Sequence, residues 1–345
     1  MVRAKAGGRK TTHRRAGAPC LSFIIVAWNR CELTLGCLRS IFENVQDVGF
    51  EVLLVDNAST DGTAEIVGRE FPDVTVLVNK AHLGFAAANN VAIARARGRL
   101  LVLLNTDTKL TPGAVETMVD FMDSHPDVGV AGPQLLNEDG SKQNSIANFP
   151  CLATEFVNKA LLRLLLPSRH PSKYFGHDSP IDVESIIGAC MVIRAEAARE
   201  IGLFDEDYYF FLEETDFCFR LKQKGWRVCH VPQAGVYHLK GASAEQRPGS
   251  AARIEYCRSM YTFFEKNRSP AESRALRRLY SLKLLVESVV HVYSCAFTLA
   301  CHADSRRRLG RYWDLVRWHW RLCPDSQGLG GNGSRRRQGG MEGGA

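Results

Sequence analysis

The chain has 345 residues, a formal net charge of +7, 45% hydrophobic residues and 23% charged residues. This length allows one large α/β domain with extensions or two modest domains, and the composition is ordinary for a globular protein. The charge is uneven: residues 1–19 carry six basic and no acidic residues, residues 271–345 carry thirteen and six, and twenty-five basic and thirty-one acidic residues lie between. A nucleic-acid-binding protein more often carries its basic patch on the folded core, so we expect no nucleic acid partner. The basic ends either contact an anionic surface or serve as solubilising tails.

The eleven cysteines form no C-x-x-C pair and no zinc-type spacing with histidine. Several lie in apolar runs, where a free cysteine behaves as a small hydrophobic residue. The first apolar run, residues 21–28, is short and is followed at once by Asn29 and Arg30, which is unlike a secretory signal. We therefore expect a protein of the reducing cytoplasm.

The N-terminal segment, residues 1–19, has no apolar periodicity and is predicted to be a disordered basic tail. Buried-type strands then alternate with helices: strands at residues 21–28, 51–57, 74–79 and 99–107, and helices at residues 33–45, 63–71 and 84–97. This alternation predicts a parallel sheet with right-handed crossovers. Ligands of such sheets bind at the carboxyl ends of the strands, where this chain carries Asn29, Asp56, Asn79 and Asp107.

The second half is less regular. It predicts, in order, a helix at 114–125, a strand at 128–136, an apolar helix at 155–166, a strand at 185–194, a loop running into a helix at 202–226 and a strand pair at 228–239. Residues 251–323 are predicted to be a helical extension. Within it, residues 280–303 are strongly apolar but interrupted by charged residues, so this helix either packs on the core or lies at a membrane interface. Residues 324–345 are predicted to be a disordered Gly/Arg tail.

The first two polar clusters follow buried strands. Asp56 opens a loop of small turn-forming residues, where its carboxylate is either a turn cap or an acceptor for a nucleobase N–H or a ribose hydroxyl. Asn105 and Asp107 lie two residues apart and therefore share one face, where an acidic pair could hold a hard cation that bridges two phosphates. The first position is Asn, so only Asp107 brings a full charge. No G-x-G-x-x-G or P-loop lies near these strands, which counts against a dinucleotide dehydrogenase or a P-loop NTPase.

The third cluster consists of Glu213, Glu214 and Asp216 among aromatic residues, where a loop turns into a helix. Close carboxylates repel one another, and desolvation by phenylalanines raises the pKa of at least one. A carboxylate with a raised pKa is suited to act as a general base on a sugar hydroxyl. The alternative is that these acids cap the helix and are favoured by its dipole.

Taken together, the chain resembles family 2 glycosyltransferases of the GT-A fold, and within them the rhamnosyltransferase-like branch that builds bacterial cell-surface polysaccharides. The resemblance covers about residues 20–245 and rests on six motifs in the family's order: AWNR, VDNASTDGT, NKAHLGFAAANN, LLNTDT, IIGACMVIRAEAAREIGLFDEDYYFFLEETDFCFRLKQKGW and YHLKGAS. It implies a Rossmann-like α/β domain over residues 20–250, with a mostly parallel sheet flanked by helices and followed by the helical extension.

The resemblance also implies roles for residues that bind the donor, a nucleotide-diphosphate sugar. Asp56 would bind the base or ribose, with Trp28 and Asn29 at the mouth of the same pocket. The segment 84–90 would close over the nucleotide. Further residues on the donor side are Asn79, Gly84, Asn89 and Asn105.

On the catalytic side, the resemblance implies that Asp107 binds Mg²⁺ or Mn²⁺ and that His238 is a further ligand or a donor to a phosphate oxygen. Glu214 stands where the family places its base. Because Glu replaces Asp there, the assignment stays open between Glu214, Glu213 and Asp216. Residues 188–190 would line the acceptor side, with Asp205 as support.

The implied reaction is a single inverting displacement onto a hydroxyl of a glycan or polyprenyl-linked acceptor. The basic and aromatic C-terminal helices would give peripheral contact with the cytoplasmic face of a membrane. The alternative from another class is a non-catalytic nucleotide-sugar-binding protein, motivated by the N-x-D and Glu-Glu departures. A sugar-nucleotide pyrophosphorylase would carry a Gly-rich basic loop after the first strand, and AWNRCEL is not such a loop.

Overall fold

The computed structural model of the protein describes residues 19–166, 178–239, 249–297, 303–321 and 329. The predicted disordered tails, residues 1–19 and 324–345, lie outside the described residues except for Pro19 and Leu329. The strands are β1 (Leu21–Ala27), β2 (Phe50–Asp56), β3 (Val74–Val78), β4 (Leu100–Asn105), β5 (Thr108–Leu110), β6 (Val128–Leu136), β7 (Ile146–Ala147), β8 (Ile181–Asp182), β9 (Ser185–Ile186), β10 (Cys190–Arg194) and β11 (Arg227–His238). The helices are α1 (Cys31–Asn44), α2 (Thr63–Glu70), α3 (Phe85–Ile93), α4 (Ala114–Ser124), α5 (Leu152–Phe156), α6 (Lys159–Leu165), α7 (Ala195–Ile201), α8 (Glu213–Gln223), α9 (Gly249–Asn267), α10 (Pro270–Phe297) and α11 (Ala303–Trp320).

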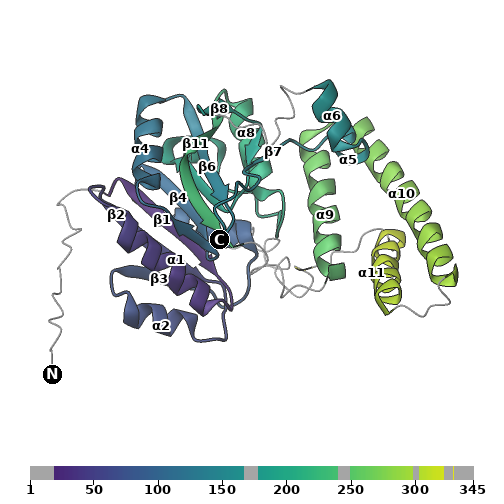
Figure 1. Ribbon diagram of the computed structural model, residues 1–345, viewed down its shortest axis with the longest axis horizontal. Coiled ribbons are helices and arrows are strands. Elements are labelled where there is room, and N and C mark those ends of the chain that lie inside the picture. The colour runs from purple at the N-terminus through teal and green to yellow at the C-terminus, as the bar shows by residue number, and fades with distance from the viewer. Residues whose placement is uncertain (1–18, 167–177, 240–248, 298–302, 322–328, 330–345) are drawn as a thin grey trace, which may run out of the picture.

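In the described part of the chain, one nine-stranded sheet runs in the order β3-β2-β1-β4-β10-β6-β11-β5, and β8 pairs with β11. The strands β3, β2, β1 and β4 are parallel to one another. β10 enters antiparallel between β4 and β6, whereas β6 and β11 are again parallel. The predicted mixed α/β architecture with a mostly parallel sheet is therefore confirmed. Figure 1 labels β1, β4 and β6 in this sheet; β10 pairs antiparallel between β4 and β6, which puts the end of β4 beside the residues that precede β10.

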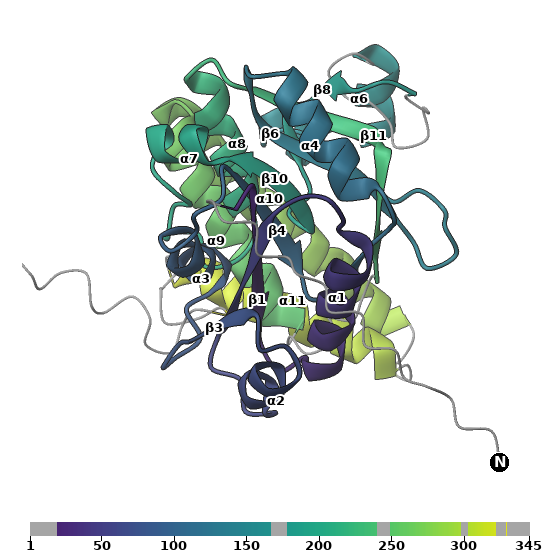
Figure 2. The ribbon, with the colours of Figure 1, turned by 90° about the vertical axis from the view of Figure 1, so that its left-hand side faces the viewer.

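Side chains that alternate along the strands build a separate hydrophobic core on each face of the sheet. Phe23 and Ile25 face α1, α2 and α4, whereas Ile24 faces α3, α7 and α8. Figure 2 shows α1 and α4 on one side of the sheet and α3 and α7 on the other. Because both faces are covered, the central strands β1, β2 and β4 are mostly apolar and are buried along most of their length.

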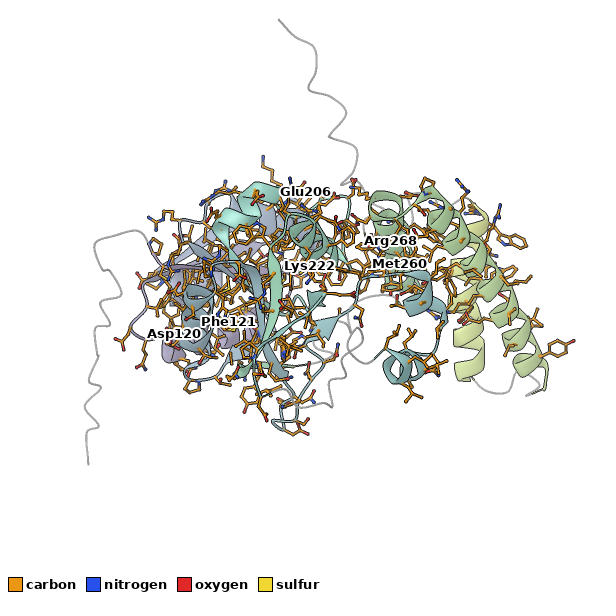
Figure 3. The ribbon with its side chains drawn as sticks, turned by 90° about the horizontal axis from the view of Figure 1, so that it is seen from above. Asp120, Phe121, Glu206, Lys222, Met260 and Arg268 are labelled. Atoms are coloured by element: carbon orange, nitrogen blue, oxygen red, sulfur yellow. The ribbon has the colours of Figure 1, made fainter. Side chains whose placement is uncertain are left out.

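The three C-terminal helices, α9, α10 and α11, pack together around a third hydrophobic core that includes Trp318, which is fully buried. This core is joined to the α/β part through Tyr208, which belongs to the loop before α8. Figure 3 labels Met260 of α9 and Arg268, the residue just after α9, between the α/β part and α10. Arg268 donates to the carbonyl of Pro150. The predicted helical extension thus packs directly on the site-bearing part of the chain.

The structure differs from the predicted elements at three places. The apolar helix predicted at 155–166 is two short helices, α5 and α6. The strand predicted at 185–194 is interrupted between β9 and β10 by residues 187–189, which line a pocket. The strand pair predicted at 228–239 is the single strand β11, whose register shifts between Val231 and Gly235. Among the described residues, none of the helices is both long and apolar enough to span a bilayer.

Candidate active site

A pocket of about 360 Å³ lies where the ends of β1, β2 and β4 meet the start of α8. Donor-side and catalytic-side segments that are far apart in the sequence share its wall. Its lining residues are Val26, Trp28, Arg30, Asn57, His82, Gly84, Phe85, Asn105, Thr106, Ala147, Ile187, Gly188, Ala189, Phe210, Phe211, Leu212, Glu213, Glu214, Thr215, His238 and Tyr256. Ligands of α/β sheets bind at this end of the strands.

Glu214 lies in the first turn of α8 and lines this pocket. Burial raises the pKa of its carboxyl, and hydrogen bonds from the backbone N–H groups of Glu214, Gly188 and Thr215 offset part of that rise. Gly188 lies against the Glu214 side chain, because a Cβ built on it would be 3.5 Å from the Glu214 carboxyl carbon. The interruption between β9 and β10 therefore makes room for this carboxylate, which can accept a proton from a bound hydroxyl.

The backbone just before α8 is strained. Phe211 and Leu212 have φ angles of +74° and +64°, in the left-handed region that bulky side chains rarely adopt. Tertiary hydrogen bonds hold this loop: Ser259 of α9 donates to the carbonyl of Phe210, and the backbone N–H of Phe85 donates to the carbonyl of Tyr209. Strained residues of this kind persist only where the surroundings over-determine them. The loop is thus fixed from two sides and sets the direction in which α8 begins.

Asp107 and His238 form the candidate cation site. Asp107 is 3% exposed, and its Oδ1 lies 3.5 Å from Nε2 of His238, the last residue of β11. Nδ1 of His238 lies 3.1 Å from Oε1 of Gln143, which orients the ring with Nε2 toward Asp107. Among the described residues, no group of three or more His, Cys, Asp or Glu gathers as a metal cluster. One carboxylate and one imidazole nitrogen are groups that bind divalent cations, and a cation held by them would take its other ligands from phosphate oxygens and water.

Asn57 organises the opposite side of the pocket. It is 1% exposed; its amide nitrogen donates to the carbonyl of Gly84, and its amide oxygen accepts from Asn79 and from the backbone of Leu83. Gly84 has φ +85°, and a Cβ there would lie 2.4 Å from the carbonyl oxygen of Tyr209. Only glycine therefore fits between the donor-side loop and the loop before α8.

The pocket wall on the β1 side includes Trp28, His82 and Arg30. The rings of Trp28 and His82 meet edge to face at 4.6 Å, and Nδ1 of His82 is 2.6 Å from the hydroxyl of Tyr209. Arg30 lines the same wall, and its Nη2 is buried without a hydrogen-bond partner among the described residues. A buried guanidinium nitrogen with free donors is a binding position for an anion.

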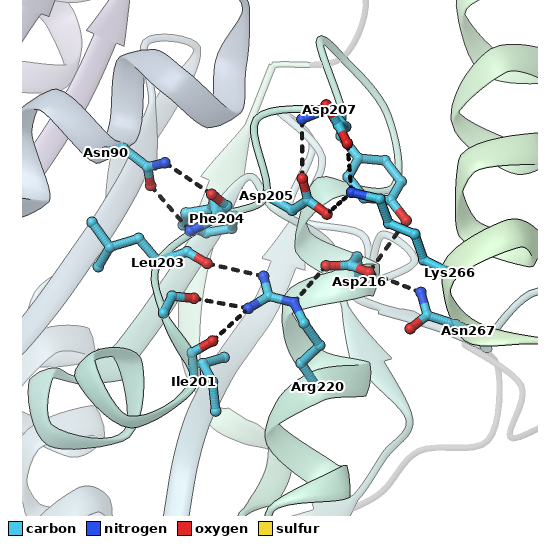
Figure 4. Close-up of polar contacts among 12 residues, drawn as sticks. Asn90, Ile201, Leu203, Phe204, Asp205, Asp207, Asp216, Arg220, Lys266 and Asn267 are labelled. Atoms are coloured by element: carbon cyan, nitrogen blue, oxygen red, sulfur yellow. Dashed lines mark hydrogen bonds and ion pairs between the residues drawn. The ribbon is translucent and has the colours of Figure 1, made fainter. Parts of the chain in front are cut away.

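Asp216 is not among the residues that line the pocket, and Figure 4 shows the polar contacts that hold it. Its carboxylate is 1% exposed and accepts from Nε of Arg220 at 2.7 Å, from the hydroxyl of Tyr208 at 3.2 Å and from Nδ2 of Asn267 at 2.8 Å. Arg220 also donates to backbone carbonyls of the turn after α7, Leu203 among them. The acids of the third sequence cluster thus separate: Glu213 and Glu214 face the pocket, whereas Asp216 ties α8 to α9.

A family model described as Glycosyl transferase family 2 matches residues 22–202 of the chain. The chain belongs to this family. The predicted family and fold are therefore confirmed, and the protein is a glycosyltransferase.

Three known proteins illustrate the similarity. The glycosyltransferase is 30% identical over 234 residues to the N-acetylglucosaminyl-diphospho-decaprenol L-rhamnosyltransferase of Mycobacterium tuberculosis, covering 63% of this chain and 75% of that protein. It is 29% identical over 231 residues to the O-antigen biosynthesis protein RfbC of Myxococcus xanthus, covering 66% of this chain but only 18% of that longer protein. The mannosyltransferase PcManGT from Pyrobaculum calidifontis, solved with GDP-Man and Mn²⁺, matches with a TM-score of 0.52 at 17% identity, covering 87% of this chain and 86% of that one. At this identity the structural match supports the fold alone.

The glycosyltransferase fold brings some of the predicted site residues into the pocket and keeps others behind it. Those in the wall are Trp28, Gly84, Asn105, Glu213, Glu214 and His238. The others support the wall or lie apart from it: Asn29 accepts from the backbone of Thr60, Asp56 accepts from the backbone of Ser59, Asn79 donates to Asn57, Asn89 donates within α3, Asp107 pairs with His238, Asp205 pairs with Lys266, and Asp216 pairs with Arg220.

Sequence reasoning did not single out Arg30, Asn57, His82, Tyr209 or Tyr256, which the structure places in or against the pocket. Arg30 and Asn57 do lie inside motifs that carried the family resemblance, so position next to a strand end could have found them. Tyr256 belongs to α9, beyond all of those motifs. Its contribution depends on how the helical extension packs, which no local pattern encodes.

Proposed function

We propose that this glycosyltransferase is inverting and metal-dependent, and that it transfers a sugar from a nucleotide-diphosphate donor to a hydroxyl of a lipid-linked glycan. The observation that carries the proposal is Glu214: a carboxyl with a raised pKa that shares one pocket with the strand-end residues Asn105 and His238. A base on one side of a pocket and an anion-binding edge on the other is the arrangement that a single displacement needs.

In the proposed step, Glu214 takes the proton of the acceptor hydroxyl while the acceptor oxygen bonds to the anomeric carbon. The bond from that carbon to the diphosphate oxygen breaks, and the nucleoside diphosphate leaves with its electron pair. The acceptor approaches opposite to the leaving group, so the configuration inverts, and no covalent intermediate forms on the chain. Glu213 is the alternative base in the same wall, whereas Asp216 is assigned a positioning role because its carboxylate is already bound by three donors.

We propose that Asp107 and His238 hold Mg²⁺ or Mn²⁺, which when bound neutralises charge on the leaving diphosphate. Arg30 is proposed to bind a phosphate oxygen through its unpartnered Nη2. Asn57, whose amide closes the donor-side loop, is proposed to set the nucleotide side of the pocket together with Trp28.

The donor and acceptor are proposed from the relatives. We propose dTDP-rhamnose as the first donor to test, because the M. tuberculosis relative is a rhamnosyltransferase, and a polyprenyl-diphosphate-linked sugar as the acceptor, because the name of that relative includes a decaprenol. The O-antigen relative supports a role in cell-surface polysaccharide synthesis. An acceptor anchored in a bilayer further requires peripheral contact with a membrane, which we propose occurs at its cytoplasmic face.

The test is transfer from a panel of dTDP-, UDP- and GDP-sugars with and without Mg²⁺ or Mn²⁺, preceded by a thermal-shift screen, since a ligand that binds the native state raises the unfolding temperature. Asp107→Ala should abolish the metal-dependent part of the shift, and Arg30→Ala should weaken nucleoside diphosphate binding about tenfold. If Asp107→Ala and Glu214→Gln both left transfer unchanged, the site assignment would be wrong. Tight donor binding without turnover on any acceptor would instead favour a non-catalytic nucleotide-sugar-binding protein.

A further inference from the structure

The helix α10 is apolar on two opposite faces, and only one of them is packed. Leu276, Tyr280 and Leu284 repeat every fourth residue and are buried in the C-terminal core. The opposite face carries eight large, exposed apolar side chains, with exposed fractions of 37–73%: Leu279, Leu282, Leu285, Val286, Val289, Val290, Val292 and Tyr293. A globular protein in water rarely leaves so many neighbouring apolar side chains uncovered, so this outer face of α10 needs an occupant.

Position in the molecule makes this outer face accessible. In Figures 1 and 3, α10 is the outermost helix at the end of the molecule away from α1 and α2. The outer face runs from residue 279 to residue 293, about 21 Å along a helix. This is long enough to lie in the plane of a bilayer surface, with the helix axis parallel to it.

The charges around the outer face identify the occupant. Arg274, Arg278 and Lys283 are exposed on the N-terminal half of α10. At 100° per residue, Arg278 lies between Leu285 and Val289 on the outer face itself. Long basic side chains can bury their aliphatic stems among apolar groups while the charged ends reach phosphate headgroups.

Acidic groups are kept away from the outer face. Glu287, in the middle of α10, points to the packed side and accepts a hydrogen bond from Tyr312 of α11. Among the described side chains between residues 274 and 293, no other carboxylate is present. A second copy of the chain would bring the same cations, and residues 271–345 carry thirteen basic against six acidic residues, so an anionic partner is favoured over a copy of this chain.

We propose that the outer face of α10 docks the glycosyltransferase on an anionic lipid surface. The outer face of α10 would be the site of the membrane contact that the proposed lipid-linked acceptor requires. Only the biological purpose of the docking rests on that proposed function. α11 extends the same chemistry: Trp313 and Trp320 are 48% and 78% exposed, seven residues apart, and the Arg317 guanidinium lies 5.7 Å from the Trp313 ring centre. Tryptophan beside arginine is typical of side chains at a lipid–water interface.

The test is co-sedimentation of the full-length protein with vesicles of phosphatidylcholine alone and of phosphatidylcholine with phosphatidylglycerol in equal amounts. We expect binding to the anionic vesicles only, reduced by high salt because the exposed cations are screened. The triple variant Leu282→Ser/Leu285→Ser/Val289→Ser should lower the partition coefficient by about tenfold or more. The control is Val78→Ser on β3, whose side chain is 65% exposed and far from α10 in sequence and in the figures, and which should bind as the parent does.

The readouts keep folding, docking and catalysis apart. Unchanged thermal unfolding and nucleotide binding in the triple variant would show that it is folded. Unchanged vesicle binding by the triple variant would overturn the proposal. The proposal would also be wrong if the parent protein did not bind anionic vesicles but formed a dimer, measured by light scattering, and the triple variant stayed monomeric. Vesicle binding that depends on α10 in a protein without transfer activity would support this inference and count against the proposed function alone.

Discussion

At the scale of single residues, the acids at the start of α8 have different surroundings. Glu214 keeps a carboxyl with a raised pKa in the pocket wall, whereas the carboxylate of Asp216, two residues later, accepts hydrogen bonds from a guanidinium and two further donors. The difference arises from α8, because residues i and i+2 point to different sides of a helix. Glu214 therefore lines the pocket, and Asp216 contacts α9.

Glu214→Gln should lower transfer by 10²–10⁴-fold, roughly the range of a lost general base, and leave donor affinity unchanged. In the parent, the acidic limb of kcat/KM should lie above the usual pKa of glutamate, because the base is lost once Glu214 is protonated.

A raised carboxyl pKa contributes stability at low pH that is lost as the pH rises through the folded-state pKa. Glu214→Gln should therefore unfold at a higher temperature than the parent near pH 7, with the difference disappearing in acid.

The control for this prediction is Glu196→Gln, which changes an exposed glutamate in the first turn of α7. It should alter neither transfer nor its pH profile. If the acidic limb of the kcat/KM profile were unchanged in Glu214→Gln, the general base would be Glu213 instead.

At the scale of elements, two loops meet at Gly84. The donor-side loop is organised by Asn57, and the loop before α8 is held in a strained conformation by α9 and by Phe85. The carbonyl of Tyr209 lies so close to Gly84 that the two loops can approach only in the absence of a side chain. This contact couples the nucleotide side of the pocket to the direction of α8.

Gly84→Ala should destabilise the protein and weaken donor binding, because its Cβ would overlap the Tyr209 carbonyl as well as occupy a positive φ. Gly140→Ala is a matched control, since Gly140 has φ +78° and a Cβ there would meet nothing within 4 Å. We expect about 1 kcal/mol of lost stability for Gly140→Ala and at least 1 kcal/mol more for Gly84→Ala, measured by urea unfolding. Equal losses of unfolding free energy in the two variants would show that the contact between the two loops does not contribute to stability.

At the scale of the whole molecule, α9, the first of the C-terminal helices, contributes to the candidate site. Asn267 of α9 donates to Asp216, and Lys266 of α9 pairs with Asp205 (Figure 4). Tyr256, also of α9, lines the pocket. The helix α8, which carries the proposed base, and the helix α9 that holds it both lie outside the segment that the family model matches, which ends at residue 202.

Asp216→Asn should cost about 2–3 kcal/mol, less than the 3–5 kcal/mol typical of a broken buried pair because the Arg220 side chain is 26% exposed. It should also lower kcat more than donor affinity, because it loosens α8 and not the nucleotide side. Asp123→Asn, in the exposed ion pair with Arg99, should cost less than about 1 kcal/mol and leave kcat unchanged. Denaturant unfolding and separate measurement of kcat and donor Kd check both; a similar cost in the two variants would contradict the positioning role of Asp216.

The sequence by itself determined the elements of the first half and the end of the sheet at which chemistry occurs, because apolar strands, turn residues and helix periods are local properties. It also determined the family, since its motifs are short and ordered. Only the tertiary structure decided that β10 runs antiparallel beside β4, that Glu214 faces the pocket while Asp216 faces α9, and that one face of α10 is covered and the other is not. Each of these features depends on which distant segment packs against a residue. The sequence around a carboxylate or a leucine does not specify that segment, because the contact forms only in the folded chain.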